Sequence, residues 1–162
     1  MKGKVAVYPG SFDPITFGHL DILHRGLELF ETVIVAIANN IEKKALFTVE
    51  ERKELIRGSI NNDDNVIIDS FEGLLVDYVK QVDAPFVIRG LRAMSDFEYE
   101  FQMASMNRNL NPEMDTLFMM TSKDYFFVSS RTIKEVAAFN GSVAVFVPKV
   151  VELSLKEKFS HK

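Results

Sequence analysis

Apolar and polar positions along the chain form two alternating kinds of block. Short runs that are apolar throughout predict strands buried on both faces. Between these runs, apolar residues recur every three or four positions, which predicts helices with one buried face. Buried strands that alternate with helices are typical of βαβ units, so the pattern predicts a parallel sheet covered by helices on both faces. The predicted strands are residues 4–8, 33–38, 66–68, 86–89 and 115–120.

Helices are predicted between these strands, and one of them has a clear start signal. The segment Thr48-Val-Glu-Glu51 is a capping box, so a helix begins near Val49. Pro148 is expected as the first residue of a last helix, which runs to about Phe159. The remaining predicted helices are residues 20–30, 71–82, 95–110 and 130–139, and a short extended piece is expected at 143–147.

No linker, internal repeat or low-complexity tract interrupts this pattern. We therefore expect a single domain over residues 1–162, with a short C-terminal helix at about 148–159. The expected fold is α/β and Rossmann-like, with a five-stranded parallel sheet and helices on both faces.

The predicted helix at 95–110 is unusual because it is apolar on two faces. A helix of this kind is buried on two sides, either as a central core helix or as a helix between the core and a subunit interface. We favour the interface, since so short a chain has no obvious further layer. The two stripes are Phe97, Phe101 and Ala104 on one side, and Tyr99, Met103, Met106 and Leu110 on the other.

Composition narrows the class of protein. Of 162 residues, 47% are hydrophobic and 26% are charged, which is ordinary for a globular domain with a buried core. The formal net charge of −4 argues against a nucleic-acid partner, because general nucleic-acid binders carry a basic face. The longest aliphatic run, 33–38, is too short to span a bilayer, so no membrane partner is expected. The chain has no cysteine, which excludes disulfides and a cysteine nucleophile and fits a cytoplasmic location.

Polar residues gather directly after the predicted strands. Ligands of open parallel sheets bind beyond the carboxyl ends of the strands, so these residues would share one edge. Three of the five loops carry Lys or Arg although the chain is acidic overall, which indicates an anionic ligand. In chain order the loops hold Ser11, Asp13, Thr16 and His19; Asn39, Asn40, Lys43 and Lys44; Ser70, Glu72 and Gly73; Arg89 and Arg92; and the segment 121–131.

Several of these residues have a structural interpretation beside the functional one. A serine before a helix, such as Ser129, is more often a plain N-cap than a phosphate ligand. A lone histidine such as His19 is more often structural than catalytic, although Gly18 before it permits close approach of the backbone. Asp13 is interpreted as a turn residue. Glu100 is interpreted as the partner of a nearby cation such as Arg92, which is compatible with orienting a nucleotide.

Three segments resemble known motifs, in the same order along the chain. "YPGSFDPITFGH" (8–19) resembles the first signature of the HxGH nucleotidylyltransferase superfamily, in its Thr-x-Gly-His form. "IRGLRAMSDFEYEFQMASMNRNL" (88–110) resembles one branch, the phosphopantetheine adenylyltransferases of coenzyme A biosynthesis. "FVSSRTIKEVA" (127–137) is similar to the late Ser-Ser motif of that branch. The resemblance extends from the first strand to about Pro148.

The resemblance implies a fold of nucleotidylyltransferase type and transfer of AMP from ATP to 4′-phosphopantetheine. The products would be dephospho-coenzyme A and pyrophosphate, formed without a covalent enzyme intermediate. The resemblance also implies Mg²⁺ held by phosphates rather than by side chains, coenzyme A as a further ligand, and a homohexamer. A homohexamer suits the two apolar faces of the helix at 95–110.

The resemblance also implies a set of site residues. His19, Lys43 and Arg89 would be catalytic, with His19 stabilising the transition state. Phosphopantetheine would contact Ser11, Lys43, Leu75 and Arg89. ATP would contact Ser11, Phe12, His19, Gly90, Leu91, Arg92, Glu100, Tyr125, Phe126, Phe127, Val128, Ser129, Ser130 and Arg131.

Two positions depart from the pattern of the family. Arg131 stands where many relatives have Ser or Thr, and Phe126 stands where many have Ser. We expect Arg131 to add a contact to the triphosphate.

Three rival hypotheses remain open at this point. The first is a related nucleotidylyltransferase that acts on a different phosphate ester, such as nicotinate mononucleotide or glycerol phosphate. The second is a nucleotide-binding module without catalysis, which would bind ATP but never release pyrophosphate. The third is a purely structural oligomer, which gives no reason for cations along one sheet edge.

Overall fold

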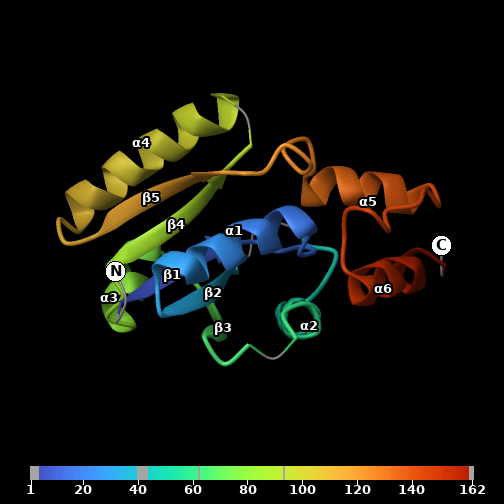
Figure 1. Cartoon of the computed structure of the whole chain (residues 1–162), viewed down its shortest axis with the longest axis horizontal. Coiled ribbons are helices and arrows are strands. Elements are labelled where there is room, and N and C mark those ends of the chain that lie inside the picture. Colours follow the sequence, from blue (N-terminus) through green and yellow to red (C-terminus); the bar gives the residue numbers. More distant parts are fainter. Residues whose placement is uncertain (1–3, 40–43, 62, 93, 161–162) are drawn as a thin grey trace.

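The computed structural model describes residues 4–39, 44–61, 63–92 and 94–160, and these form a parallel sheet flanked by helices (Figure 1). The strands are β1 (Val5–Gly10), β2 (Thr32–Ala38), β3 (Val66–Phe71), β4 (Phe86–Leu91) and β5 (Asp115–Met120). The helices are α1 (Phe17–Leu29), α2 (Val49–Arg57), α3 (Leu75–Gln81), α4 (Met94–Leu110), α5 (Ser130–Ala138) and α6 (Lys149–Ser160). No helix in the described part of the chain is long and apolar enough to cross a membrane.

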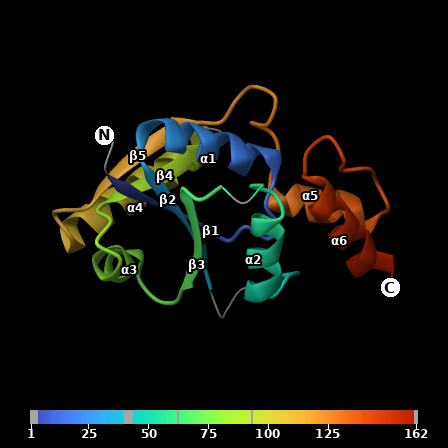
Figure 2. The ribbon, with the colours of Figure 1, turned by 60° about the horizontal axis from the view of Figure 1, so that its bottom comes forward.

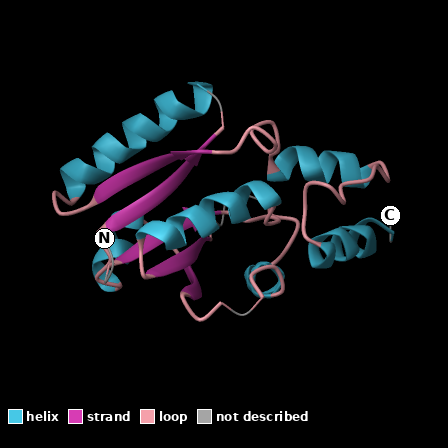
Figure 3. Ribbon diagram, viewed as in Figure 1, coloured by secondary structure: helices cyan, strands magenta, loops and turns pink. Residues whose placement is uncertain are grey.

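The five strands form one parallel sheet in the order β3-β2-β1-β4-β5, seen as the magenta arrows of Figure 3. β2 and β3 lie on one side of β1. The chain then crosses over, and β4 and β5 lie on the other side. The strand order reverses between β1 and β4, and open α/β sheets bind ligands at such a switch point.

Alternate residues of the central strands supply two hydrophobic cores, because side chains along a strand point to opposite faces. Ala6 and Tyr8 of β1 are buried with residues of α1, α2, α5 and α6, whereas Val7 is buried with residues of α3. In Figure 2 the helices α1 and α3 lie on opposite sides of the sheet, and α5 and α6 lie side by side beyond one end of it. The expected α/β fold with helices on both faces is confirmed.

Several predicted boundaries differ from the structure. The helix predicted at 20–30 begins at Phe17, and the helix predicted at 71–82 spans Leu75–Gln81. Strands β1, β3 and β4 each run two or three residues further than predicted. Among the strands the largest difference is in β3, because its polar residues Asp69 and Ser70 do not follow the apolar pattern of a buried strand. β3 is an edge strand, where polar side chains are tolerated, and the Asp69 carboxylate accepts a hydrogen bond from the Tyr78 hydroxyl at 2.7 Å.

The extended piece expected at 143–147 is wrong. This segment forms a turn, in which the Phe146 N–H donates to the carbonyl of Val143 at 2.9 Å. Val143 and Val147 are buried, so the apolar residues of this segment pack a turn against the core and do not form a strand. Pro148 directly precedes α6, and its carbonyl accepts from the first turn, so it caps the helix instead of being its first residue.

The helix α4 is not a central core helix. Both of its predicted stripes carry side chains that are well exposed in the single chain. The exposed large side chains are Phe97, Tyr99, Phe101, Met103, Met106 and Leu110, with relative exposures from 37% to 63%.

Asp13 is more than the turn residue expected, because its buried carboxylate joins three segments of the chain. It accepts from the backbone N–H groups of Leu46 at 3.0 Å and Phe47 at 2.9 Å, just before α2. It also pairs with Lys134 of α5 at 2.5 Å. Burial raises the pKa of Asp13, but the hydrogen bonds from Lys134 and the two amides outweigh it, so the pKa is lowered from its ordinary value.

We predict that Asp13→Ala lowers the free energy of unfolding by about 3–5 kcal/mol, because it leaves Lys134 and two backbone amides without their partner. Urea unfolding at neutral pH measures the loss. Asp115→Ala is the control, since Asp115 is exposed and pairs with Arg108 at 3.5 Å. The control should cost less than about 1 kcal/mol. Equal losses in the two variants would contradict the role of Asp13.

Candidate active site

A cleft of about 490 Å³ opens at the carboxyl ends of β1 and β4. Its walls come from the β1–α1 loop, the first turns of α1, the end of β4, one face of α4, and the segment that leads from β5 into α5. The cleft therefore lies at the switch point of the sheet, the position where the strand order predicts a ligand.

The cleft brings together most of the predicted site residues, although they are more than a hundred positions apart in the chain. Those that line it are Ser11, Phe12, His19, Arg89, Gly90, Arg92, Glu100, Tyr125, Val128, Ser129, Ser130 and Arg131.

Some predicted residues are placed elsewhere. Leu91 is buried within β4, and Leu75 packs on α3 against the core of the opposite face. Phe126 and Phe127 are more than half exposed, and Phe127 packs edge-on against Phe146 instead of lining the cleft. Lys43 lies outside the described residues. The roles expected for these five residues, like those expected for the residues that line the cleft, stay predictions.

The cleft also contains residues that the sequence did not single out. Tyr8 lies in a predicted strand and Ile22 in a predicted helix, and each packs in the core and also lines the cleft. The signal that marks Tyr8 is its place two residues before the end of β1. Burial raises the pKa of the Tyr8 hydroxyl well above its usual value. Tyr99 of α4 also lines the cleft and was not expected there.

Hydrogen bonds to three carbonyl groups hold the end of β1 and the β1–α1 loop. Arg89 donates to Pro9 at 2.9 Å, and the buried Arg52 of α2 donates to Ser11 at 2.8 Å. The Ser130 hydroxyl donates to the carbonyl of Pro14 at 2.7 Å. The loop is thus fixed by three other segments, and the groups that it presents to the cleft are preorganised.

Arg89 forms a two-point ion pair with Glu100. Its Nε donates to one carboxylate oxygen at 2.7 Å, and its Nη2 donates to the other. Glu100 was expected to pair with a nearby cation such as Arg92. It does pair with a nearby cation, but that cation is Arg89, which β4 places opposite α4. Planar guanidinium and carboxylate groups match in this arrangement, which fixes the direction of the arginine.

The amino terminus of α5 lies at the cleft wall. Ser129 is its N-cap, with a hydroxyl that accepts from the N–H of Thr132 at 3.0 Å, so the structural interpretation of Ser129 is confirmed. The hydroxyl of Ser130 is also engaged within the protein. The N–H groups of Ser130 and Arg131, in the unpaired first turn, are the donors that remain for an anion.

His19 is the third residue of α1 and is held on two sides. Its Nδ1 accepts from the backbone N–H of Thr16 at 3.1 Å and lies 2.9 Å from the Thr16 hydroxyl. The ring of Phe12 packs edge-on against the imidazole with centroids 5.2 Å apart. Burial, with a smaller effect of Arg92, lowers the pKa of His19 to about 4, so the ring is neutral near pH 7.

The described residues contain no group of three or more His, Cys, Asp or Glu side chains that could hold a metal ion. Among the described residues that line the cleft, Glu100 is the one with a carboxylate, and this carboxylate is paired with Arg89.

Comparison with known proteins defines the class first. Residues 7–136 match the profile of the cytidylyltransferase-like family. The chain is similar in fold to a candidate nicotinate-nucleotide adenylyltransferase from Vibrio parahaemolyticus (TM-score 0.72, 18% identity, 100% of this chain and 97% of that one). It is also similar to a bifunctional NMN adenylyltransferase/ADP ribose pyrophosphatase from Francisella tularensis (TM-score 0.65, 17% identity, 89% and 44%). At these identities the likeness shows the fold alone. The chain is a nucleotidyltransferase of the cytidylyltransferase-like family.

Sequence similarity then defines the branch. The chain is 56% identical over 155 residues to the phosphopantetheine adenylyltransferase of Anaeromyxobacter dehalogenans strain 2CP-C, covering 96% of this chain and 94% of that protein. It is 52% identical over 160 residues to the protein of that name from Geobacter metallireducens, covering 99% and 98%. The chain belongs to the phosphopantetheine adenylyltransferase family, and the expectation from its three motifs is confirmed.

Proposed function

We propose that this chain transfers the adenylyl group of ATP to 4′-phosphopantetheine and releases pyrophosphate and dephospho-coenzyme A. The observation that carries the proposal is the identity of 52–56% with relatives of that name over nearly the whole chain. The chemistry of the cleft agrees with it, because arginines and helix N-termini surround a space where two anions must meet. We place the reaction in the cytoplasm, where ATP is available.

The proposed reaction is a direct in-line attack by the acceptor phosphate, without a covalent enzyme intermediate. A phosphomonoester has a second pKa of about 6, so the acceptor is mostly a dianion at neutral pH and needs no general base. The barrier comes from repulsion between this dianion and the triphosphate. The protein therefore has to align the two substrates and to stabilise the charge that develops in the transition state.

Arg89 is suited to hold the acceptor phosphate. A guanidinium has five N–H donors, and the bonds to Glu100 and Pro9 use three of them. Two donors remain, in a direction that the ion pair with Glu100 fixes. In this proposal Lys43 and Ser11 add contacts to the same phosphate, and Leu75 contacts the pantetheine arm.

The nucleotide would occupy the other part of the cleft. Gly90, Leu91, Arg92 and Glu100 would hold the nucleoside, and 125–131 would close over adenine and the triphosphate. The free N–H groups at the start of α5 suit the triphosphate, because the positive end of the helix dipole adds to their hydrogen bonds. The neutral His19, with Ser11 and Phe12 beside it, is proposed to donate from Nε2 to a non-bridging oxygen of the α-phosphate.

Mg²⁺ is proposed as the ion that accompanies ATP. The donor set of the cleft fits an ion held by phosphate oxygens and water, since Glu100 is paired with Arg89. When bound, the ion would neutralise part of the charge on the leaving pyrophosphate. Dephospho-coenzyme A and coenzyme A are proposed as further ligands of the cleft, because they share the adenylyl and pantetheine groups of the substrates.

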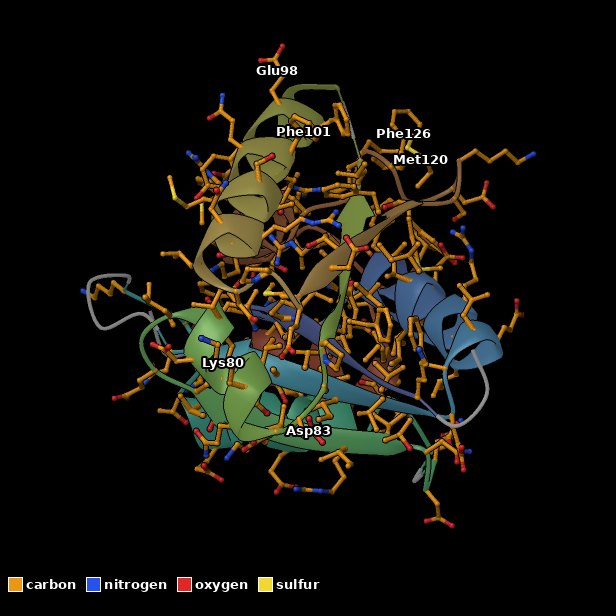
Figure 4. All side chains as sticks on the ribbon, turned by 90° about the vertical axis from the view of Figure 1, so that its left-hand side faces the viewer. Lys80, Asp83, Glu98, Phe101, Met120 and Phe126 are labelled. Carbon is orange, nitrogen blue, oxygen red and sulfur yellow. The ribbon has the colours of Figure 1, made fainter. Side chains whose placement is uncertain are left out.

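A homohexamer is proposed as the assembled form. The exposed apolar side chains of α4 suit an interface between subunits, since so large an uncovered patch is unusual on a monomer. Figure 4 shows that this surface continues past the helix: Phe101 of α4 lies near the end of the molecule where Met120 and Phe126 project.

We predict pyrophosphate release when the chain is given Mg-ATP and 4′-phosphopantetheine, and none when nicotinate mononucleotide or glycerol phosphate replaces the acceptor. A coupled pyrophosphate assay measures this. Release with another acceptor alone would favour a different nucleotidyltransferase activity. ATP binding without release from any acceptor would favour a binding module.

We predict that Arg131→Ser raises the KM for ATP about tenfold and leaves the KM for phosphopantetheine unchanged, because a charged contact to the triphosphate is lost. Arg131 is 88% exposed and pairs at 3.0 Å with Glu135, one helical turn away. Glu135→Gln is the matched control: it removes the pair but keeps the cation, and should leave both KM values unchanged. An unchanged KM for ATP in Arg131→Ser would show that Arg131 makes no such contact.

We predict that sedimentation gives a particle of six times the 18.4 kDa chain mass, and that Phe101→Glu converts it to smaller species. A charge on α4 would have to be desolvated in the interface. Phe139→Glu is the control, because Phe139 is 87% exposed and lies at the far end of α5. A monomeric protein, or equal effects of the two substitutions, would exclude α4 as the interface.

A further inference from the structure

Two helices of the chain begin with the same hydrogen-bonded cap, but with different residues at the third position. In α2 the Glu51 carboxylate accepts from the N–H of Thr48 at 2.8 Å, and the Thr48 hydroxyl accepts from the N–H of Glu51 at 3.2 Å. In α1 the partner of Thr16 is His19, whose ring nitrogen Nδ1 takes the place of the carboxylate oxygen. A capping box ordinarily has Glu or Gln at this position.

This substitution has a chemical consequence for the histidine ring. A backbone N–H can only donate, so Nδ1 must offer a lone pair to Thr16. The neutral ring then carries its proton on Nε2. A protonated Nδ1 would bring two N–H groups face to face at a distance of 3.1 Å. The cap therefore excludes both the imidazolium and the other neutral tautomer.

We propose that Thr16 is a positioning residue for the transfer reaction: by capping α1 through Nδ1, it holds His19 as the neutral tautomer and aims the Nε2–H at the cleft. The kinetic part of this inference rests on the proposed function, whereas the tautomer is a property of the free protein.

Three other features of the site agree with this role. Thr16 is only 2% exposed, so its hydroxyl has little water to compete for it. Phe12 supports the other side of the ring from a left-handed backbone conformation (φ 45°), which is strained for a bulky residue and is kept where the surroundings require it. The positive end of the α1 dipole disfavours a charged imidazole at the third position of the helix.

Gly18 lets this cap lie against the opposite wall of the cleft. A Cβ at position 18 would lie 3.3 Å from the Cβ of Tyr125 and 3.6 Å from the Thr16 hydroxyl oxygen. A larger residue would push the first turn of α1 away from the segment after β5. The spacing Thr-x-Gly-His thus combines a cap, a close approach and a donor within one helical turn.

The tautomer is tested first, without substrate. In protein labelled with ¹⁵N in histidine, the ring signals of His19, assigned by their absence in His19→Ala, should show a protonated Nε2 and an unprotonated Nδ1 at pH 7. A proton on Nδ1, or averaging between the two tautomers, would overturn the proposal. This arm gives a result even if the chain transfers AMP to a different acceptor.

The second arm compares Thr16→Val with Thr48→Val, which removes the equivalent hydroxyl from the cap of α2. Each change should lower the midpoint of urea unfolding by a similar small amount, because each removes an N-cap hydroxyl. Only Thr16→Val should also lower kcat, by about tenfold, with the KM for ATP unchanged. In that variant Nδ1 of His19 keeps the Thr16 N–H but loses the hydroxyl 2.9 Å away, which helps to hold the ring in place. Thr16→Ser, which restores the hydroxyl, should recover turnover. Equal kcat values in the two valine variants would show that Thr16 is only a helix cap.

A double-mutant cycle decides whether Thr16 acts through His19. His19→Ala should lower kcat by about 10²–10³, the usual cost of losing one donor to a developing charge. Adding Thr16→Val to His19→Ala should cost nothing further, because the residue that Thr16 positions is gone. Losses that simply multiply would contradict the proposal. Wild-type protein that releases no pyrophosphate would instead refute the proposed function and leave the NMR result to decide the tautomer.

Discussion

The buried carboxylate of Asp13 is the interaction on which the cleft depends. A charge that is 5% exposed is tolerated only with its hydrogen bonds satisfied, and its partners come from separate parts of the chain. Leu46 and Phe47 bring the start of α2 to the loop, and Lys134 brings α5. A parallel sheet alone would leave both helices free to pack elsewhere along its edge. Burial of this one acid therefore fixes where the β1–α1 loop and α5 meet at the cleft.

The cations near the sheet edge perform two different tasks. Arg52 and Lys134 hold the β1–α1 loop from behind, through the carbonyl of Ser11 and the carboxylate of Asp13. Arg89, Arg92 and Arg131 line the cleft itself. The net charge of −4 gives no sign of these local cations, because acidic residues outnumber basic ones over the whole chain. Local charge, rather than net charge, is what an incoming polyphosphate meets.

The strands and helices could be predicted because buried parallel strands appear in the sequence as unbroken apolar runs. Contacts between distant segments have no such pattern in the sequence. The convergence of 8–19, 88–92 and 125–131 followed from strand polarity alone. The partner of Glu100 could not be predicted in this way. Choosing Arg89 over Arg92 requires knowing which of the two lies opposite Glu100 of α4. The turn at 143–147 was missed because a buried valine looks the same in a turn and in a strand. For Asp13, the residues that bury it lie about thirty and 120 positions away.

The neutrality of His19 makes sense in a cleft that already has arginines on its walls. A charged imidazole here would be buried and repelled by Arg92, and the arginines already supply positive charge to the cleft. The imidazole instead supplies a hydrogen-bond donor with a fixed direction. It accepts from Thr16 at one nitrogen and can donate from the other, on the far side of a rigid ring. A lysine or arginine could not accept that bond, and a glutamate could accept it but not donate. A glutamine has both groups, but on a side chain with three flexible torsions. The histidine of this motif is thus the residue that closes a helix and aims a proton donor with one rigid group.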